Sequence, residues 1–421
     1  MTTGAIAIPR DRTDRPIPEA RVLVMVVLAL MAFGVLMVYS ASRSVDPADG
    51  GSYFVRHLIF LPIAIVAMAF GACVPYHWLN RGWLAAAIYI GTVGLLGLVL
   101  LFGDPVNGAR RWFSVAVAGM RVSFQPSELA KVGLVIFLAW FFSSPSRVAC
   151  GRATAGSPCQ GGDRPKADAR SFLRSFLPAM GAIGLVVALI VKEDFGTAAL
   201  VGFVALLLCL IAGCRWWHFL TVLPFAGLGF WLTVVRVEYR WDRLIAFVNP
   251  WAHQDGAGWH ITQSLMGIGR GGFFGVGLGA GVQKFYIPEC ETDFIFSVLC
   301  EEMGLVGAIL VLGLFGVFVW RAGRVIRRAP DRFGFLLATG ALLTISLQAV
   351  MNIGVVTSAL PAKGIGLPFI SYGGSGLVMM SLAAGLIASV ARHSGSRGRP
   401  LWTGAASGPS PLARRRTCYG H

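Results

Sequence analysis

Three acidic residues stand close together directly before a long apolar run. Glu289, Glu291 and Asp293 lie in the stretch Lys284-Phe-Tyr-Ile-Pro-Glu-Cys-Glu-Thr-Asp-Phe-Ile-Phe296. Desolvation at such a boundary raises the pKa of a carboxyl group towards the range that suits a general base. Thr292 or Asp293 could equally cap the helix that begins there, because both residue types favour helix N-termini. The pattern therefore predicts either a catalytic carboxylate at Asp293 or a helix cap.

A second group of charged residues opens another apolar run. In Gln125-Pro-Ser-Glu-Leu-Ala-Lys131, Pro126 suits the first turn of a helix. Glu128 and Lys131 then lie on one face of that helix, at a spacing that allows them to pair. A charge pair inside a spanning helix is expensive and by default marks a functional interior. The alternative is an ion pair that only holds two helices together.

Charged residues also stand at two places whose partners the sequence does not name. Arg110, Arg111 and Trp112 form a basic and aromatic cluster. This cluster could hold a phosphate group or lie among lipid headgroups. Glu301 and Glu302 lie about two turns into an apolar run, so they must face the interior of the protein or pair with a cation.

The stretch Leu360-Pro-Ala-Lys-Gly-Ile-Gly-Leu-Pro-Phe-Ile-Ser-Tyr-Gly-Gly-Ser375 combines prolines and glycines at the start of the last apolar run. This composition predicts a broken or re-entrant segment, which is tolerated at membrane depth only where it lines a cavity or is buried in protein. Lys363 is the expected anion partner there. Ser371, Tyr372 and Ser375 could contact a ligand, or the run could serve close helix packing.

Such residues need a membrane to position them. Of the 421 residues, 56% are hydrophobic and only 13% are charged, about half the charged share of a soluble domain. The net charge of +16 is carried by short basic clusters between apolar runs, which is typical of a topology signal and argues against a nucleic-acid partner. The 8 cysteines include no C-x-x-C pair, so no metal ligand set can be named. We therefore expect an all-α integral membrane protein surrounded by lipid.

Apolar runs of spanning length predict about ten transmembrane helices, each helical because lipid cannot satisfy backbone groups. They cover residues 22–41, 55–74, 83–102, 126–142, 172–191, 197–213, 217–235, 294–320, 333–356 and 367–391.

Basic residues in the connections set the orientation of these helices. Lys and Arg cluster in the connection 143–171, after the eighth run and in the tail 393–421. The positive-inside rule assigns these segments to the cytoplasm, together with the N-terminal tail 1–21. The ten-helix membrane domain then spans 22–392. The connection 236–293, between helices 7 and 8, lies on the extracytoplasmic side.

The connections differ in what their composition predicts. The outer connection 236–293 is far longer than a helix-to-helix turn needs and is rich in aromatic residues, which favours a segment that folds back onto the bilayer surface. Residues 103–125 are expected to form a second outer loop. The connection 143–171 and the tail 393–421 are rich in Gly, Ser, Pro and Arg, so we expect them to be mobile, solvated and without chemistry.

Taken together, these motifs resemble the FtsW/RodA/SpoVE family, the SEDS peptidoglycan glycosyltransferases. The resemblance runs from the first apolar run to about Arg392. The chain departs from the family pattern at Glu291, where His is common, at Ile287, where Leu is usual, and at Gly376, where Ser is usual. The matching stretches are Gly108-Ala-Arg-Arg-Trp112, Gln125-Pro-Ser-Glu128 with Lys131, Tyr286-Ile-Pro-Glu289, Thr292-Asp-Phe-Ile-Phe296, Glu301-Glu-Met-Gly304, Asn352, and Gly364 through Ser375.

The resemblance implies that the protein extends glycan strands from lipid II at the outer face of the cytoplasmic membrane. Asp293 would be the essential carboxylate and general base, and Glu128 with Lys131 the buried pair needed for activity. The chemistry fits, because an acceptor hydroxyl must lose a proton while it attacks an anomeric carbon that carries a diphosphate. The expected substrate-binding residues are Arg110, Arg111, Trp112, Lys284, Glu289, Lys363, Ser371, Tyr372 and Ser375. This scheme requires no cofactor. A divalent cation such as Mg²⁺ could assist by stabilising the leaving diphosphate.

Lys363 before Gly364 makes the chain more similar to FtsW division proteins than to RodA elongation proteins. This resemblance implies septal wall synthesis, a class B penicillin-binding transpeptidase as partner, and other divisome proteins. A RodA-type elongation polymerase is the alternative within the family. A lipid II transporter is the main alternative outside it, although we find no internal repeat and the acids gather at one face rather than at the midplane. A non-catalytic scaffold would not explain acids at an apolar boundary.

Overall fold

The computed structural model describes residues 18–42, 50–106, 109–117, 120–144 and 172–394. The predictions for the tail 1–21 and the connection 143–171 lie almost wholly outside the described residues, as does that for the tail 393–421.

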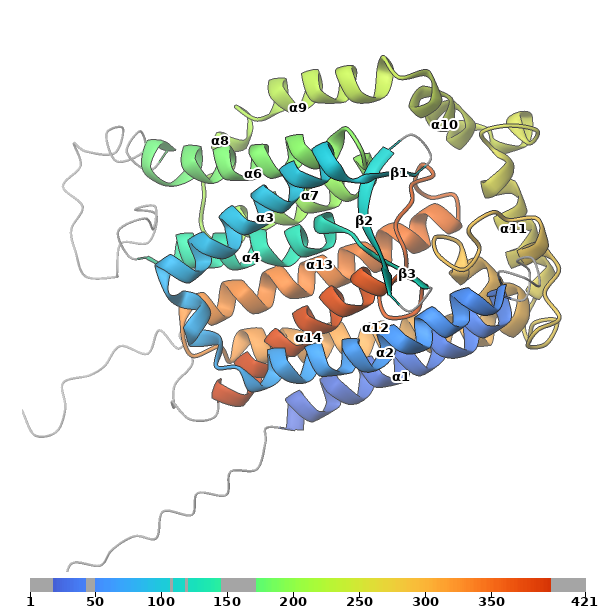
Figure 1. Ribbon diagram of the computed structural model, residues 1–421, viewed down its shortest axis with the longest axis horizontal. Coiled ribbons are helices and arrows are strands. Elements are labelled where there is room, and N and C mark those ends of the chain that lie inside the picture. Colours follow the sequence, from blue (N-terminus) through green and yellow to red (C-terminus); the bar gives the residue numbers. More distant parts are fainter. Residues whose placement is uncertain (1–17, 43–49, 107–108, 118–119, 145–171, 395–421) are drawn as a thin grey trace, which may run out of the picture.

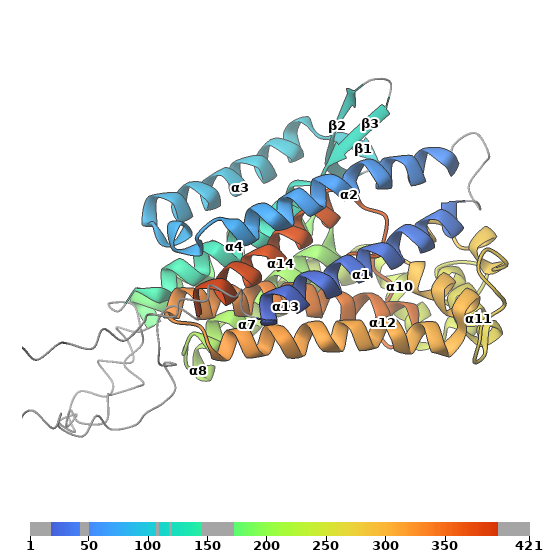
Figure 2. The same cartoon turned by 90° about the horizontal axis from the view of Figure 1, so that it is seen from below.

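Long helices lie side by side along the molecule (Figures 1 and 2), and each predicted apolar run coincides with a helical segment. Of the helices in the described chain, 9 are long and apolar enough to cross a membrane, and one further apolar helix is shorter. The predicted helical membrane fold is therefore confirmed. The segments are α1 (Pro18–Ala41), α2 (Gly50–Cys73), α3 (Gly82–Phe102), α4 (Pro126–Ser143), α6 (Leu177–Val191), the shorter α7 (Phe195–Ile211), α8 (Trp216–Phe219) with α9 (Leu223–Phe230), α12 (Ile295–Arg327), α13 (Arg332–Val356) and α14 (Gly374–Ser394).

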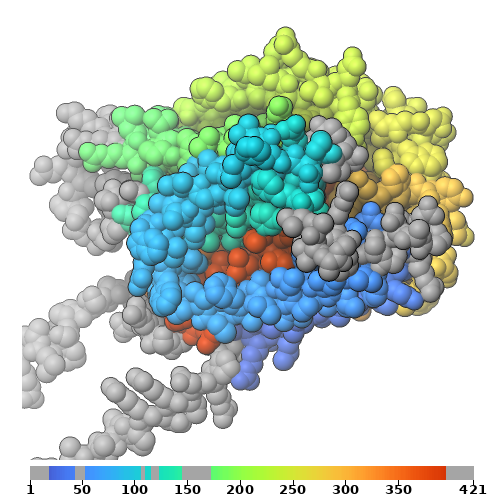
Figure 3. All heavy atoms as spheres, in the orientation of Figure 1, coloured from blue at the N-terminus to red at the C-terminus, as the bar shows by residue number. Residues whose placement is uncertain are grey.

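Burial separates central helices from peripheral ones. In α4, 78% of an 18-residue apolar stretch is buried inside the protein. In the corresponding stretch of Trp216–Val235, only 6% is buried. Both are apolar, so the difference lies in whether protein or lipid surrounds them. The space-filling view shows a hollow between α2 and α3 with α14 at its base (Figure 3). The central helices α4, α13 and α14 are therefore the elements that can position a buried site.

Three arginines tie together the helix ends that the charge counts place on the cytoplasmic side. Arg332 donates to the carbonyl oxygens of Phe142 and Ala212, at the ends of α4 and α7. Arg392 donates to the carbonyl of Ala72 at the end of α2, and Arg328 pairs with Glu19 at the start of α1. These ends therefore meet at one end of the bundle, as the predicted topology requires.

The predicted outer loop 103–125 contains β-strands, which the sequence analysis did not predict. This segment forms a three-stranded antiparallel sheet, β1 (Asp104–Val106), β2 (Ala109–Val117) and β3 (Met120–Phe124), in the order β1-β2-β3. Its β-branched and aromatic residues favour strands, and outside the hydrocarbon region nothing forces the backbone to be helical. The sheet carries the predicted Arg110–Trp112 cluster on β2.

Two predicted helices are interrupted. The run 217–235 consists of α8, α9 and a π-helical turn over Trp231–Val235, with Pro224 in the first turn of α9, where a missing N–H is tolerated. The last helix begins at Gly374 rather than at residue 367. Residues 361–367 before it have no regular structure and 368–373 only turns and bends, which agrees with the predicted broken segment.

The outer connection 236–293 contains two helices that the sequence analysis did not predict. These are α10 (Glu238–Val248) and α11 (Trp259–Gly271). Both are amphipathic, and α11 packs against α12 and α13 through Ser264, which donates to the carbonyl of Val356 and accepts at its own carbonyl from Ser297. The connection is therefore a folded cover over the outer end of the bundle.

A break inside α12 joins this cover to the bundle. Gly304 has φ 63° and ψ −160°, so its neighbours cannot complete the helical ladder. Leu305 and Val306 donate their N–H groups to the carbonyls of Gly272 and Phe273 instead. A Cβ at position 304 would meet the backbone of Phe273 and Gly275. Only glycine fits both the backbone angles and the available space.

We therefore predict that Gly304→Ala lowers the free energy of unfolding by about 2 kcal/mol or more, through backbone strain and overpacking. Gly313→Ala, in the same helix, is the matched control, because a Cβ there meets nothing within 4 Å. It should leave stability unchanged or raise it by up to ~1 kcal/mol. Thermal unfolding of the detergent-solubilised variants is the measurement, and equal effects of both substitutions would contradict the prediction.

Candidate active site

A large cavity opens at the outer end of the bundle. Its volume is about 950 Å³. It lies among α4, α7, α10, α11, the turn that precedes α12 and the irregular segment before α14. The polar residues on its wall include Arg111, Gln125, Glu128, Lys131, Asp194, Arg240, Arg243, His260, Glu289, Glu291, Asp293, Gln348, Lys363, Ser371, Tyr372 and Ser375. The three separate sequence motifs therefore meet in one place.

Asp293 lies in this wall, two residues before α12 begins. Burial raises the pKa of its carboxyl group well above the usual range; the negative charges of Glu289 and Asp194 add to this, and Arg243 and Arg111 oppose it. The side chain still keeps partial exposure because it faces the cavity. A carboxylate with a raised pKa is a stronger base than an ordinary aspartate, which suits a general base.

The helix-cap interpretation of this segment is not supported. Phe294 is the N-cap of α12, and no side chain caps that helix. The hydroxyl of Thr292 donates to the carbonyl of Glu289. The backbone carbonyl of Asp293 accepts a hydrogen bond of 2.7 Å from Asn352 Nδ2. The carboxylate of Asp293 is therefore not used by the helix terminus.

The two neighbouring acids share the cavity wall but differ in exposure. Glu289 is exposed and has φ 57°, a left-handed conformation, and its carbonyl accepts the N–H groups of Thr292 and Asp293. Glu291 is buried; its carboxylate lies 3.4 Å from the Cys290 thiol, and its carbonyl accepts the N–H of Tyr372 at 2.9 Å. The turn thus brings the predicted acidic cluster together and joins it to the segment before α14.

Glu128 and Lys131 form the predicted pair and also face the cavity. Lys131 Nζ lies 2.7 Å from Glu128 Oε1 and 2.7 Å from Oε1 of Gln348 on α13. The other oxygen, Glu128 Oε2, is buried and has no hydrogen-bond partner within the described part of the chain. The pair therefore ties α4 to α13 and at the same time presents a carboxylate to the cavity.

One face of α13 connects this pair to Asp293. Gln348 Nε2 donates to the carbonyl of Gly366 at 2.9 Å. One turn further along, Asn352 Nδ2 donates to the carbonyls of Ile365 and Asp293, at 2.7 Å each. Gln348 and Asn352 are four residues apart and so lie on the same face of the helix. They fix the irregular segment and the carboxylate turn against each other.

Of the predicted cations, Arg111 and Lys363 reach the cavity wall, whereas Arg110 does not. Arg110 is exposed, and its guanidinium donates to the carbonyl of Leu101. Neighbouring residues of a strand point to opposite faces, so only one of the two arginines can face the site. Burial lowers the pKa of Lys363, and Asp194 opposes this shift.

The structure removes Lys284 from the predicted substrate-binding set. Its side chain is 2% exposed and is absent from the cavity wall. Lys284 Nζ lies 2.8 Å from Glu302 Oε1, which also supplies the partner that the sequence could not name for that glutamate. Both residues lie near the outer end of the bundle, but the side chain of Lys284 faces the interior of the protein rather than the cavity.

Of the polar cavity residues named above, sequence reasoning missed five, namely Asp194, Arg240, Arg243, His260 and Gln348. Asp194 caps α7 by accepting from the N–H and hydroxyl of Thr197. Arg240 and Arg243 project from α10. Their spacing of three residues within an amphipathic stretch was the available signal, because it places two cations on one helix face.

The hydroxyl groups before α14 are mainly engaged with the backbone. Ser371 Oγ accepts the N–H of Leu367 at 2.6 Å, and Ser375 Oγ accepts the N–H of Gln125 at 3.4 Å. The ring of Tyr372 packs edge-on against Tyr53, with centroids 5.2 Å apart. All three residues line the cavity, together with Trp112. The contacts of the two serines favour the packing alternative for them over direct ligand contact.

Within the described residues, no group of three or more His, Cys, Asp or Glu side chains is arranged to hold a metal ion. The described acids of the cavity are therefore not clustered as a metal ligand set.

The chain is similar to known proteins over most of its length. The family model described as "Cell cycle protein" (FTSW_RODA_SPOVE) matches residues 20–396. A Coxiella burnetii protein named "Probable peptidoglycan glycosyltransferase FtsW" is 39% identical over 381 residues, which cover 88% of this chain and 95% of the relative. "Stage V sporulation protein E" of Bacillus subtilis is 39% identical over 380 residues, 88% of this chain and 96% of its own.

Solved structures show the same arrangement of helices. A chain of the structure described as "Structural coordination of polymerization and crosslinking by a peptidoglycan synthase complex" is similar with a TM-score of 0.69 and 27% identity, and the match covers 88% of this chain and 97% of that one. The rod shape determining protein RodA of Thermus thermophilus gives 0.59 and 28%, over 88% and 96%. With these matches over almost its whole membrane domain, the chain belongs to the FtsW/RodA/SpoVE family.

Proposed function

We propose that this protein is a peptidoglycan glycosyltransferase that polymerises lipid II into glycan strands at the outer face of the cytoplasmic membrane. The observation that carries the proposal is a buried carboxylate with a raised pKa in a cavity that also presents several cations. Glycosyl transfer from a diphosphate donor needs both groups, one for the proton and one for the leaving group. The activity named for the similar proteins supports the same reaction.

In this scheme Asp293 accepts the proton of the acceptor hydroxyl as the hydroxyl oxygen attacks the anomeric carbon. The bond from that carbon to the diphosphate oxygen breaks, and the electron pair leaves with the diphosphate. Cations near the leaving oxygen stabilise its developing charge. The residues of the cavity wall suited to this task are Arg111, Arg240, Arg243 and Lys363.

The finer role rests on the same resemblance. Lys363 before Gly364 favours an FtsW-type function in septal wall synthesis over a RodA-type function in elongation. The chain would then act in the inner membrane at the division septum with a class B penicillin-binding transpeptidase and other divisome proteins. The similar structure of a complex for polymerisation and crosslinking supports a transpeptidase partner.

The carboxylate is the first test. We expect Asp293→Ala to abolish polymerisation of lipid II by the purified protein with its transpeptidase partner, and to leave the fold intact. Asp255→Asn, which changes an exposed acid of the same outer connection, is the control and should polymerise like the wild type. Normal polymerisation by Asp293→Ala would refute the assignment of the base. A wild type that flips labelled lipid II but never lengthens glycan would establish the transporter alternative.

The raised pKa makes a second prediction. A base works only when deprotonated, so kcat should fall as the pH drops through the pKa of Asp293, above the range of an ordinary aspartate. Glu289→Gln removes the like charge that contributes most to this shift. The acid limb of the kcat–pH profile should therefore move to lower pH. An unchanged limb, or a move to higher pH, would show that Asp293 is not the titrating base.

The contacts of α13 give a third prediction. Gln348→Leu leaves Lys131 with Glu128 but removes its second acceptor and frees the carbonyl of Gly366. Lys131 and the irregular segment before α14 are then no longer held in place by α13. We therefore expect kcat for polymerisation to fall about tenfold or more. Ser346→Ala, on the same helix but bonded only within it, should have no such effect. Equal kcat values for both variants would rule out this role of Gln348.

A further inference from the structure

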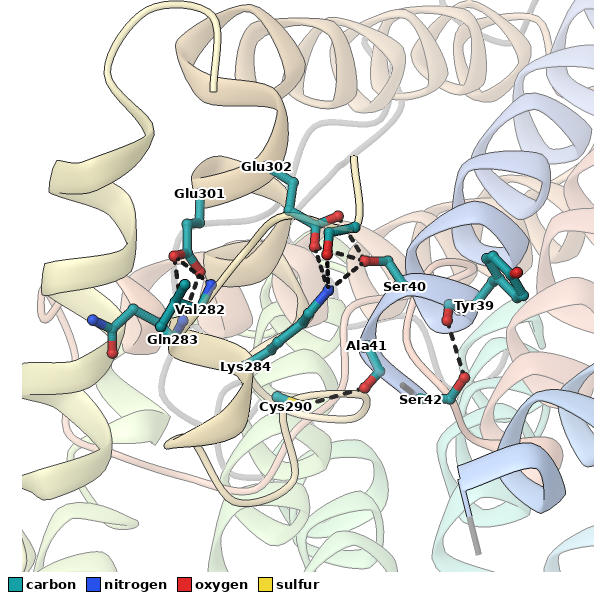
Figure 4. Close-up of polar contacts among 11 residues, drawn as sticks. Tyr39, Ser40, Ala41, Ser42, Val282, Gln283, Lys284, Cys290, Glu301 and Glu302 are labelled. Atoms are coloured by element: carbon teal, nitrogen blue, oxygen red, sulfur yellow. Dashed lines mark hydrogen bonds and ion pairs between the residues drawn. The ribbon is translucent and has the colours of Figure 1, made fainter. Parts of the chain in front are cut away.

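A second buried polar cluster lies at the outer end of the bundle, outside the cavity, and the proposed reaction does not use it. Lys284 Nζ lies 2.8 Å from Glu302 Oε1 and 3.0 Å from Ser40 Oγ, and it also donates to the carbonyl of Gly279. Ser40 in turn donates to Glu302 at 2.6 Å. Figure 4 shows these side chains pointing at one another. Exposure of the three side-chain partners is 4% or less.

The members of this cluster come from three distant parts of the chain. Ser40 is at the end of α1 and Glu302 is in α12, whereas Lys284 belongs to the outer connection. The preceding residue of α12, Glu301, accepts the backbone N–H groups of Val282 and Gln283, at 2.8 and 3.1 Å. Two adjacent carboxylates therefore hold the same short stretch of the connection, one through the backbone and one through the lysine (Figure 4).

That stretch leads directly to Asp293. Between Lys284 and Asp293 the chain forms only a short 3-10 turn and further turns, so no helix or strand carries the carboxylate. The Cys290 thiol lies 4.0 Å from the carbonyl of Ala41, which places the end of α1 against the same turn. The side-chain amide of Asn352 donates to the backbone carbonyl of Asp293 and so holds the end of the turn. The N–H of Tyr372 and the indole N–H of Trp259 donate to carbonyls in the middle of the turn, those of Glu291 and Tyr286. The cluster is the anchor at its beginning.

We propose that Lys284, Glu302 and Ser40 form a latch that positions the Asp293 turn in the cavity. The expected effect on kcat rests on the proposed function. The anchoring of the turn by the latch does not. The three residues act as positioning residues, since none of them reaches the cavity. A buried ion pair fits such a task, because desolvation makes it costly unless both partners keep one geometry, and it then specifies that geometry.

The test is the double variant Lys284→Met with Glu302→Gln, which removes both charges and leaves none buried without a partner. Replacing a buried pair in this way is often neutral for stability. We expect the melting temperature to stay close to that of the wild type and amide exchange over residues 282–293 to become faster. With lipid II, kcat should fall about tenfold or more with a smaller change in KM. The acid limb of the pH profile should move to lower pH, because a displaced Asp293 loses part of its burial.

The matched control is Glu19→Gln with Arg328→Met, which removes an ion pair between α1 and the C-terminal end of α12, at the cytoplasmic end. This variant should change neither exchange over 282–293 nor kcat. Ser40→Ala keeps the ion pair but loses one hydroxyl, and it should give smaller effects in the same direction if the double variant does not fold.

The proposal would be overturned if the latch variants had the same amide exchange over 282–293 and the same kcat as the wild type. It would also be overturned if kcat fell but the acid limb of the pH profile did not move. If wild-type protein fails to polymerise lipid II, the proposed function is wrong, and amide exchange still decides whether the latch holds the turn.

Discussion

A lysine ammonium buried in an apolar helix bundle is the constraint on which the site depends. Lys131 is 3% exposed, and an ion at that depth is stable only with close partners. Glu128 and Gln348 are those partners, so α4 and α13 cannot shift relative to each other without leaving a charge unpaired. Since α13 also holds the carbonyl of Asp293 through Asn352, one buried charge sets the frame for the Asp293 carboxylate.

The elements that lipid dictates were predictable from the sequence. In hydrocarbon an apolar run of about twenty residues has no alternative to a helix, so the spanning segments follow from composition. The same constraint disappears outside the bilayer. There the sheet formed by β1–β3 and the helices α10 and α11 arise from local propensity and from packing against the bundle. A search for long apolar runs detects neither of these.

The site was predictable as a set of motifs but not as a list of contacts. Asp293 and the Glu128–Lys131 pair were identified because charges at an apolar boundary need an explanation. Lys284 was assigned to the substrate wrongly, since topology tells which side of the membrane a cation is on but not whether it faces the cavity or the interior. Arg243 illustrates the opposite error: it faces the cavity, but it lies in α10, within a connection whose helical, amphipathic spacing the sequence analysis did not use.

The shape of the interior bears on the choice between polymerisation and transport. Alternating access needs a path from the substrate site to both faces of the membrane. On the cytoplasmic side of Lys131 lies a space of about 10 Å³, enough for about one water molecule. Its walls are apolar side chains such as Leu134, Leu138 and Val201. The charged groups of the cavity wall lie on the outer side of this packed layer. A cavity closed on the cytoplasmic side in this way suits a reaction whose substrate and product remain on the outer face, but the outward-open state of a transporter has the same shape. The carboxylate with a raised pKa beside several cations, together with the activity named for the similar proteins, is what favours the polymerase.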